Sequence, residues 1–325
     1  MIRESLKHEL IEAANKTGFT PAISILTAEA RECIHILHQE GPPSSHTGGS
    51  RVGGNPDLPD SVQWPAGRIE GDTSALADFI MQLNCAEVPV INSLRLPATG
   101  YIWVFVEALP SQGPELPIRL IYEPDSAANL NPRIIQNRTE WMLGDALNDV
   151  SVRFELGVSL PFGRARFREA IAAKRSRGTS EWIDLEGILK RSGALGQIGG
   201  YAYGLKGDDV ARIFALQRIG RSDLVEHYQW DSIAELERAI AQVPAYVRTP
   251  EDLTRWKASF ESVRPEVQWV EEHLQELDAW QLLLRLDPVP QAGLNIGDDY
   301  SVWILSYCRD RYTVDVREVA STFGN

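Results

Sequence analysis

The chain has 325 residues, of which 43% are hydrophobic and 24% are charged, and its formal net charge is −13. This composition is typical of a folded globular protein and argues against a disordered chain. The length allows one large domain or two smaller ones. The negative charge argues against binding to nucleic acid or to anionic membranes and favours a basic protein as partner.

The cysteines and the start of the chain indicate a cytoplasmic protein. Cys33, Cys85 and Cys308 are an odd number with no close pair, so we expect reduced, buried thiols and no disulfide framework. Residues 1–18 carry acids and bases at helical spacing and lack the apolar segment of a signal peptide. No apolar run approaches the ~18 residues of a membrane span.

The first predicted region, residues 1–48, consists of helices and a linker. Leu6, Leu10 and Ala14 recur at helical spacing, which predicts a helix that ends near Gly18. Thr27 resembles an N-cap and predicts a second helix that extends to about Gln39. A linker rich in glycine, proline and serine follows.

The second region, residues 49–160, is predicted to be a first β-rich half. Its opening segment, 53–59, is dense in glycine and proline and indicates a loop. Aromatic and β-branched residues then predict strands at 78–84, 101–106 and 117–122, with a weaker one at 150–156.

The third region, residues 161–325, is predicted to be a second β-rich half with a helical insertion at about 205–278. Apolar spacing predicts two helical pieces over 164–192 and three helices over 229–277. The basic residues between 164 and 177 are expected on an exposed helix face. Two buried strands at 280–287 and 301–307 follow the insertion.

Both halves use the same order of features. Each half begins with a glycine-rich loop, at 53–59 or 195–204, which contains Gly53-Gly54 or Gly199-Gly200. A strand with a polar end, a turn and a strand that contains tryptophan, Trp103 or Trp303, follow the loop. Such self-similarity predicts two structural repeats. The expected fold class is α+β: two β-rich pseudo-repeats of antiparallel or mixed sheets, with N-terminal helices and a helical insertion in the second half.

Several segments resemble the YwqG-like family of bacterial domains of unknown function. The likeness rests on GGNPDLP at 53–59, IMQLNCAEVP at 80–89, LPATGYI at 96–102 and, more weakly, WQLLLRLD at 280–287. The second half departs from the family pattern, with Arg285 where the family has glutamine. Through distant similarity to programmed cell death 2 proteins, the resemblance implies a chaperone or adaptor role, and the occurrence of YwqG-like genes among toxin and immunity loci implies protein binding.

The sequence carries no signature of known catalytic or cofactor chemistry. It lacks the nucleophile-elbow and phosphate-loop patterns, and its histidines have no zinc-site spacing. Adjacent acids such as Asp298-Asp299 are typical of solvated turns. We therefore expect no cofactor and no metal, and a non-enzymatic role is favoured over an enzymatic one.

Two functional hypotheses follow. The first is a protein-binding module, of immunity or chaperone type, whose loops present Trp64, Tyr201 and Tyr203, because aromatic residues dominate interface energetics. The second is an enzyme or small-ligand-binding protein with a cleft between the two β-rich halves. The polar residues expected in that cleft stand at the ends of buried strands: Gln82, Asn84, Arg285 and Asp287. Clamping of the neighbouring loop is an alternative role for Gln82 and Asn84, because buried polar groups need hydrogen-bond partners.

Overall fold

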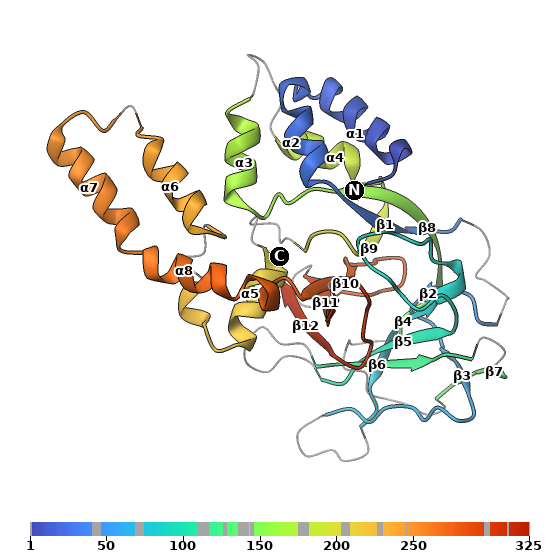
Figure 1. The fold of residues 1–325 in the computed structure, drawn as a ribbon. Coiled ribbons are helices and arrows are strands. Elements are labelled where there is room, and N and C mark those ends of the chain that lie inside the picture. Colours follow the sequence, from blue (N-terminus) through green and yellow to red (C-terminus); the bar gives the residue numbers. More distant parts are fainter. Residues whose placement is uncertain are drawn as a thin grey trace.

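The computed structural model describes the whole chain except residues 1, 41–46, 69–74, 109–116, 126–128, 136–142, 144–145, 175–181, 203–208, 226–229, 245, 296–299, 311 and 325. The chain forms an α+β structure, as the sequence predicts, in which helices flank a large antiparallel sheet (Figure 1).

The described strands are β1 (Arg31–His38), β2 (Arg51–Val52), β3 (Asp57–Pro59), β4 (Asp78–Asn84), β5 (Tyr101–Val106), β6 (Ile118–Glu123), β7 (Leu130–Pro132), β8 (Val150–Ser159), β9 (Ala194–Ile198), β10 (Trp280–Leu286), β11 (Ser301–Tyr307) and β12 (Val319–Gly324). The described helices are α1 (Glu4–Lys16), α2 (Ile23–Glu29), α3 (Ala165–Ala172), α4 (Trp182–Leu189), α5 (Val210–Arg218), α6 (Ile233–Ala241), α7 (Pro250–Glu261), α8 (Arg264–Glu272) and α9 (Leu274–Leu277), with short 3₁₀ helices η1 (Thr20–Ala22), η2 (Cys85–Glu87) and η3 (Ser222–Leu224).

Within the described residues, ten strands join in the order β12-β11-β10-β9-β1-β8-β2-β4-β5-β6, and β3 pairs with β7 separately. On each side of the central pair β1-β8, a group of four strands runs outward. One group is β9-β10-β11-β12 and the other is β2-β4-β5-β6. In the first group Trp303 lies opposite Arg285, and in the second Trp103 lies opposite Gln82.

The central strand β1 corrects the prediction of a helix from Thr27 to Gln39. Helix α2 ends at Glu29 and β1 begins at Arg31. All six residues from Glu32 to Leu37 are buried, so both faces of the segment are covered. A half-exposed helix buries only one stripe, whereas a central strand buries both faces, and this difference decides the structure.

The sheet curls around an apolar core. Val104 and Met81 from one group of strands and Leu284 and Ile304 from the other belong to the same buried cluster. The edge strands β6 and β12 consequently approach each other, with Cα atoms within 8 Å, although no hydrogen-bonded ladder of the described residues joins them. The sheet is therefore a barrel that remains open between β6 and β12.

Helices cover the sheet in two places (Figure 1). The N-terminal helices pack on the β8 side through a second cluster that includes Leu10, Leu26, Val158 and Leu160. The second half contains helices α5 to α9 between β9 and β10, so the predicted insertion is present, and α6 and α7 extend away from the sheet. The described helices include none with both the length and the apolar character that a membrane crossing requires.

Besides β1 and the short strands β2, β3 and β7, the sequence-based prediction missed β9 and β12. Strand β9 lies where the sequence indicates a glycine-rich loop, and β12 follows β11 at the end of the chain. Gly196 in β9 lies against the backbone of β10, where an added Cβ would be 2.2 Å from the carbonyl oxygen of Arg285. The glycine therefore permits close approach within a strand and does not mark a turn.

Candidate functional site

Gln82 and Asn84, at the end of β4, form hydrogen bonds to the backbone of the segments on both sides of β2. The side chain of Gln82 accepts hydrogen bonds from the Asp57 amide at 2.8 Å and from the Trp103 indole at 2.9 Å, and donates to the Gly49 carbonyl at 2.9 Å. Asn84 donates to the Gly48 carbonyl at 3.1 Å. These contacts correspond to the clamping role that the sequence offered as an alternative to ligand binding.

A buried ion pair completes this clamp. Arg51 contacts Asp57 directly and lies 3.5 Å from a carboxylate oxygen of Asp149. Burial raises the pKa of Asp149, against the opposite effect of Arg51. The charged groups of this cluster already pair with one another and with the backbone of the loop, so they are poorly placed to bind a ligand.

Arg285 and Asp287 form the corresponding polar end of β10. Arg285 is buried, its Nε lies 3.1 Å from Asp287 Oδ1, and its guanidinium lies 5.5 Å from the centre of the Trp303 ring. Because Arg285 and Gln82 are both on the face opposite the common apolar core, and four strands separate β10 from β4, the structure does not bring them together. A single site made from Gln82, Asn84, Arg285 and Asp287 is therefore not formed.

The predicted aromatic residues lie in different environments. Trp64 is half-buried, donates from its indole nitrogen to the Ala77 carbonyl at 2.8 Å and packs edge-on against Phe105. Tyr201 is buried between two guanidinium groups, those of Arg31 at 4.2 Å and Arg164 at 5.6 Å from its ring centre. Tyr203 lies outside the described residues.

A network of charges surrounds Tyr201. Arg164 contacts Asp209 at 3.1 Å and Asp231 at 3.8 Å. Burial alone would lower the pKa of Arg164, but these two carboxylates raise it above its ordinary value. The sequence predicts an exposed helix face for Arg164. The structure instead turns this side chain toward the helical insertion, where Asp209 and Asp231 contact it. Local spacing did not indicate these contacts, because both carboxylates are distant in sequence.

A cavity of about 340 Å³ adjoins this network. Its lining includes Arg31, Asn92, Tyr201, Asp278 and Gln281. Arg31 donates to Gln281 at 3.2 Å, and the Tyr201 hydroxyl donates to the Glu29 carbonyl at 2.8 Å. The volume is within the range of sites for small ligands.

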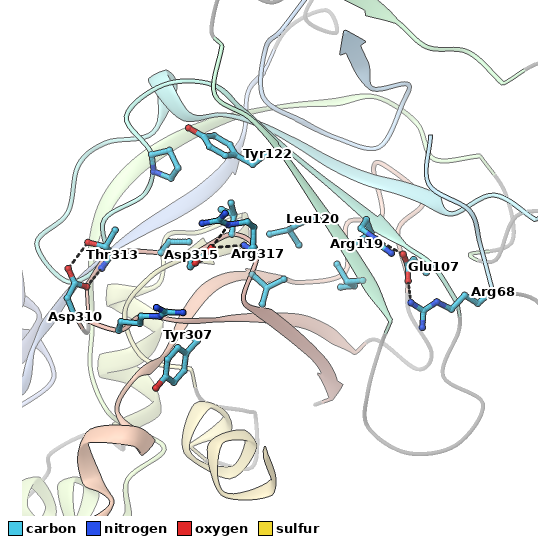
Figure 2. A pocket seen from close by; sticks show the side chains of 16 residues that line it. Arg68, Glu107, Arg119, Leu120, Tyr122, Tyr307, Asp310, Thr313, Asp315 and Arg317 are labelled. Atoms are coloured by element: carbon cyan, nitrogen blue, oxygen red, sulfur yellow. Dashed lines mark hydrogen bonds and ion pairs between the residues drawn. The ribbon is translucent and has the colours of Figure 1, made fainter. Parts of the chain in front are cut away.

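A hollow of about 1060 Å³ lies between the two open edges of the sheet. We call it the edge cleft. Figure 2 shows that side chains from β6 and from the segment leading into β12 line it. Its apolar residues are Pro97, Ile118, Leu120, Val314, Val316 and Val319, its tyrosines are Tyr122 and Tyr307, and its arginines are Arg68, Arg119, Arg309 and Arg317.

The charged residues of the edge cleft are its four arginines and the carboxylates of Glu107, Asp310 and Asp315. Glu107 is buried and forms ion pairs with Arg119, at 2.7 Å, and with Arg68, at 2.8 Å (Figure 2). Arg317 contacts Asp315 at 3.3 Å, with the arginine side chain 88% exposed and the aspartate 29%. At these two places a molecule that entered the cleft would meet guanidinium groups before carboxylates, whereas Asp310 is an exposed carboxylate that accepts hydrogen bonds from the Tyr312 and Thr313 amides.

The three cysteines are buried and unpaired. Burial raises the pKa of Cys33 to about 12 and those of Cys85 and Cys308 to about 11. Because the thiolate is the reactive form, these residues are inert near neutral pH. Within the described residues, three or more metal-binding side chains do not gather at any point.

The geometry defines an α+β protein with an open, curled antiparallel sheet whose two edges face each other across a cleft. Residues 50–304 match the family described as "Domain of unknown function (DUF1963)", and the chain belongs to this family. The matched region extends from the start of β2 into β11 and so leaves out β1 and β12. No curated protein matches the chain.

Proposed function

We propose that this protein is a non-enzymatic protein-binding module and that its partner occupies the edge cleft. The observation that carries this proposal is the cleft itself: a hollow of about 1060 Å³ between two sheet edges, with apolar walls and exposed arginines at its rim. An apolar centre with a polar rim is the usual anatomy of a protein interface.

The resemblance to YwqG-like domains supports this proposal. Through that family's likeness to programmed cell death 2 proteins, it favours a chaperone or adaptor role, and its genomic setting favours immunity. The matching strand order of the two sheet groups, and the two tryptophans opposite Gln82 and Arg285, support an internal repeat. In this reading each repeat contributes one edge strand to the cleft.

The test is affinity purification of the tagged protein from its native host, followed by mass spectrometry. Wild-type protein and the Arg255→Glu variant, whose exposed arginine lies on α7 away from the cleft, should recover the same partner. The Arg317→Glu variant should recover at least 10-fold less. Equal recovery by all three proteins, or no protein above a charge-matched control, would contradict the proposal.

A small-ligand role has its own observation, the cavity beside Tyr201. We propose this cavity as the site for the alternative function, because Gln82 and Arg285 lie apart and Tyr201 adjoins a hollow of about 340 Å³. A thermal-shift screen with small polar metabolites tests it. A ligand that stabilises wild-type protein but not the Arg31→Met variant would support the alternative, and the Arg317→Glu variant should respond as wild type does.

A further inference from the structure

We infer that the edge cleft binds its partner by β-strand addition: an extended segment pairs with β6 and directs acidic side chains toward the arginines of the cleft. This inference rests on the proposed protein-binding function and specifies its geometry and chemistry. Four observations lead to it.

The first observation is that half of the backbone hydrogen-bonding groups of β6 point away from β5. The amide of Glu107 donates to the carbonyl of Pro117 at 2.9 Å, which fixes the alternation of hydrogen bonds along the β5-β6 ladder. Arg119, Ile121 and Glu123 therefore direct their backbone groups toward β5, and Ile118, Leu120 and Tyr122 direct theirs away from it. Among the described residues no strand lies beyond this side of β6.

The second is the distance to the opposite edge. A strand that paired with both β6 and β12 would need them about 10 Å apart, twice the usual strand spacing. Their Cα atoms come within 8 Å at the closest approach, which leaves no room for a strand at that point. The added strand therefore pairs with β6 alone, along the part of β6 that lines the hollow, and the segment that leads into β12 forms the opposite wall of the cleft.

The third is the character of the two faces of β6. Ile118, Leu120 and Tyr122 pack against the apolar core inside the curled sheet, whereas Arg119 is on the other face and contacts Glu107. A neighbouring strand continues this alternation, because successive side chains point to opposite faces. The added segment should thus alternate apolar residues with polar ones.

The fourth is the charge of the polar face. Arg68 and Arg119 share the single buried carboxylate of Glu107, so one positive charge remains in excess, and Arg317 is exposed above Asp315. Carboxylates of the added segment would pair with these guanidinium groups. Four arginines line the cleft against the three carboxylates of Glu107, Asp310 and Asp315, so its lining is an exception to the negative charge of the chain. A basic partner could still present an acidic strand to it.

The experiment uses the full chain and a fluorescent seven-residue peptide that alternates valine with glutamate. Fluorescence anisotropy should show binding, and the peptide with lysine in place of glutamate should bind at least 10-fold more weakly. The Arg317→Gln and Arg68→Gln variants should also lose affinity, whereas Arg255→Gln should not. No binding of the glutamate peptide at about 1 mM, a range that includes weak complexes, would overturn the inference.

Two further readouts test strand pairing itself. Hydrogen exchange by NMR should show that the amides of Ile118, Leu120 and Tyr122 slow at least 10-fold on binding, whereas those of Arg119 and Ile121 are already protected. Of two peptides N-methylated at alternate sets of residues, one should bind and the other should not. Equal behaviour of both peptides, or unchanged exchange at Leu120, would overturn the inference.

These outcomes are separate from those of the proposed function. If a protein captured from the native host requires Arg317 but leaves the exchange of the β6 amides unchanged, strand addition is wrong and protein binding in the cleft stands. If the peptide binds with the expected pattern but no host protein depends on the cleft, the chemistry of the cleft stands and the proposed function is wrong.

Discussion

At the scale of single residues, the buried side chain of Gln82 forms hydrogen bonds to several separate parts of the first half. It is completely buried and joins β4 to β3, to β5 and to the loop before β2 through four hydrogen bonds. Buried polar groups that lose a partner cost about 1–3 kcal/mol each. The polar residues at this strand end therefore contribute to the stability of the fold.

We expect Gln82→Leu to lower the free energy of unfolding by about 2–4 kcal/mol, because it leaves the Asp57 amide and the Trp103 indole without an acceptor. Chemical denaturation measures this change. The matched control, Gln268→Leu, alters an exposed residue of α8 and should change stability by less than about 0.5 kcal/mol. Equal effects of the two substitutions would contradict the clamp.

His35, on the central strand, should make stability depend on pH. Burial, together with the nearby charges of Arg191 and Arg285, lowers its pKa to about 4, against the opposite effects of Glu9 and Glu155. The unfolded chain has a histidine pKa of about 6.5 and so binds the proton first as the pH falls. The contribution of neutral His35 is complete above about pH 6.5 and is lost as the pH falls toward 4.

We expect the wild-type protein to lose up to about 3 kcal/mol more stability than a His35→Gln variant between pH 7 and pH 4.5. Denaturation at a series of pH values measures the difference. The window stays above the range in which Glu32, whose pKa is lowered to about 2, would be protonated in the native state. His8 is exposed, and a His8→Gln control should retain the wild-type slope.

At the scale of elements, two glycines with positive φ that precede strands differ in how closely other backbone atoms approach them. Gly53 has a φ of +69°, and an added Cβ would lie 2.2 Å from the carbonyl oxygen of Asn148. Gly193, before β9, has a similar φ of +73° but nothing within 4 Å of an added Cβ. The two positions share the conformational demand for glycine and differ in the space around them.

We therefore expect Gly193→Ala to cost about 1–2 kcal/mol, the usual strain of a left-handed residue. Gly53→Ala should cost at least about 2 kcal/mol more, because the Cβ must displace the backbone of the β8 side. Midpoints of chemical denaturation compare the two variants. Similar midpoints would show that the Asn148 contact relaxes without cost.

At the scale of the whole molecule, Arg164 links the body of the sheet to the helical insertion. Its contacts to Asp209, at the start of α5, and to Asp231, before α6, are nearly buried. Breaking a buried pair leaves an uncompensated charge and is strongly destabilising. The insertion should depend on this link more than the sheet does.

We expect Arg164→Met to increase hydrogen exchange in α5 and α6 by at least 10-fold while the amides of β4 and β5 remain protected. Hydrogen-exchange mass spectrometry measures both regions at once. Arg255→Met, on the exposed face of α7, should leave both regions unchanged. Uniform faster exchange throughout the variant would show that the insertion and the sheet unfold as one unit.

Prediction from sequence succeeded where local patterns carry the structural information. Alternating and β-branched residues located β4, β5, β10 and β11, and helical spacing located α6 and α7. It failed at β1, because a strand buried on both faces resembles a buried helix, and at β9, because glycine was taken for a turn. The edge cleft was not predicted, since its two walls are separated by about two hundred residues of sequence.

By itself, the sequence determined the α+β class, the presence of a group of strands on each side of the helical insertion, the position of that insertion and the need of Gln82 and Asn84 for polar partners. Tertiary structure alone decided that one curled sheet contains both groups, that Gln82 and Arg285 face away from each other and that Arg164 turns inward. It also placed β6 opposite β12. These features depend on contacts between residues far apart in the chain, and local spacing and propensity do not encode which distant surfaces meet.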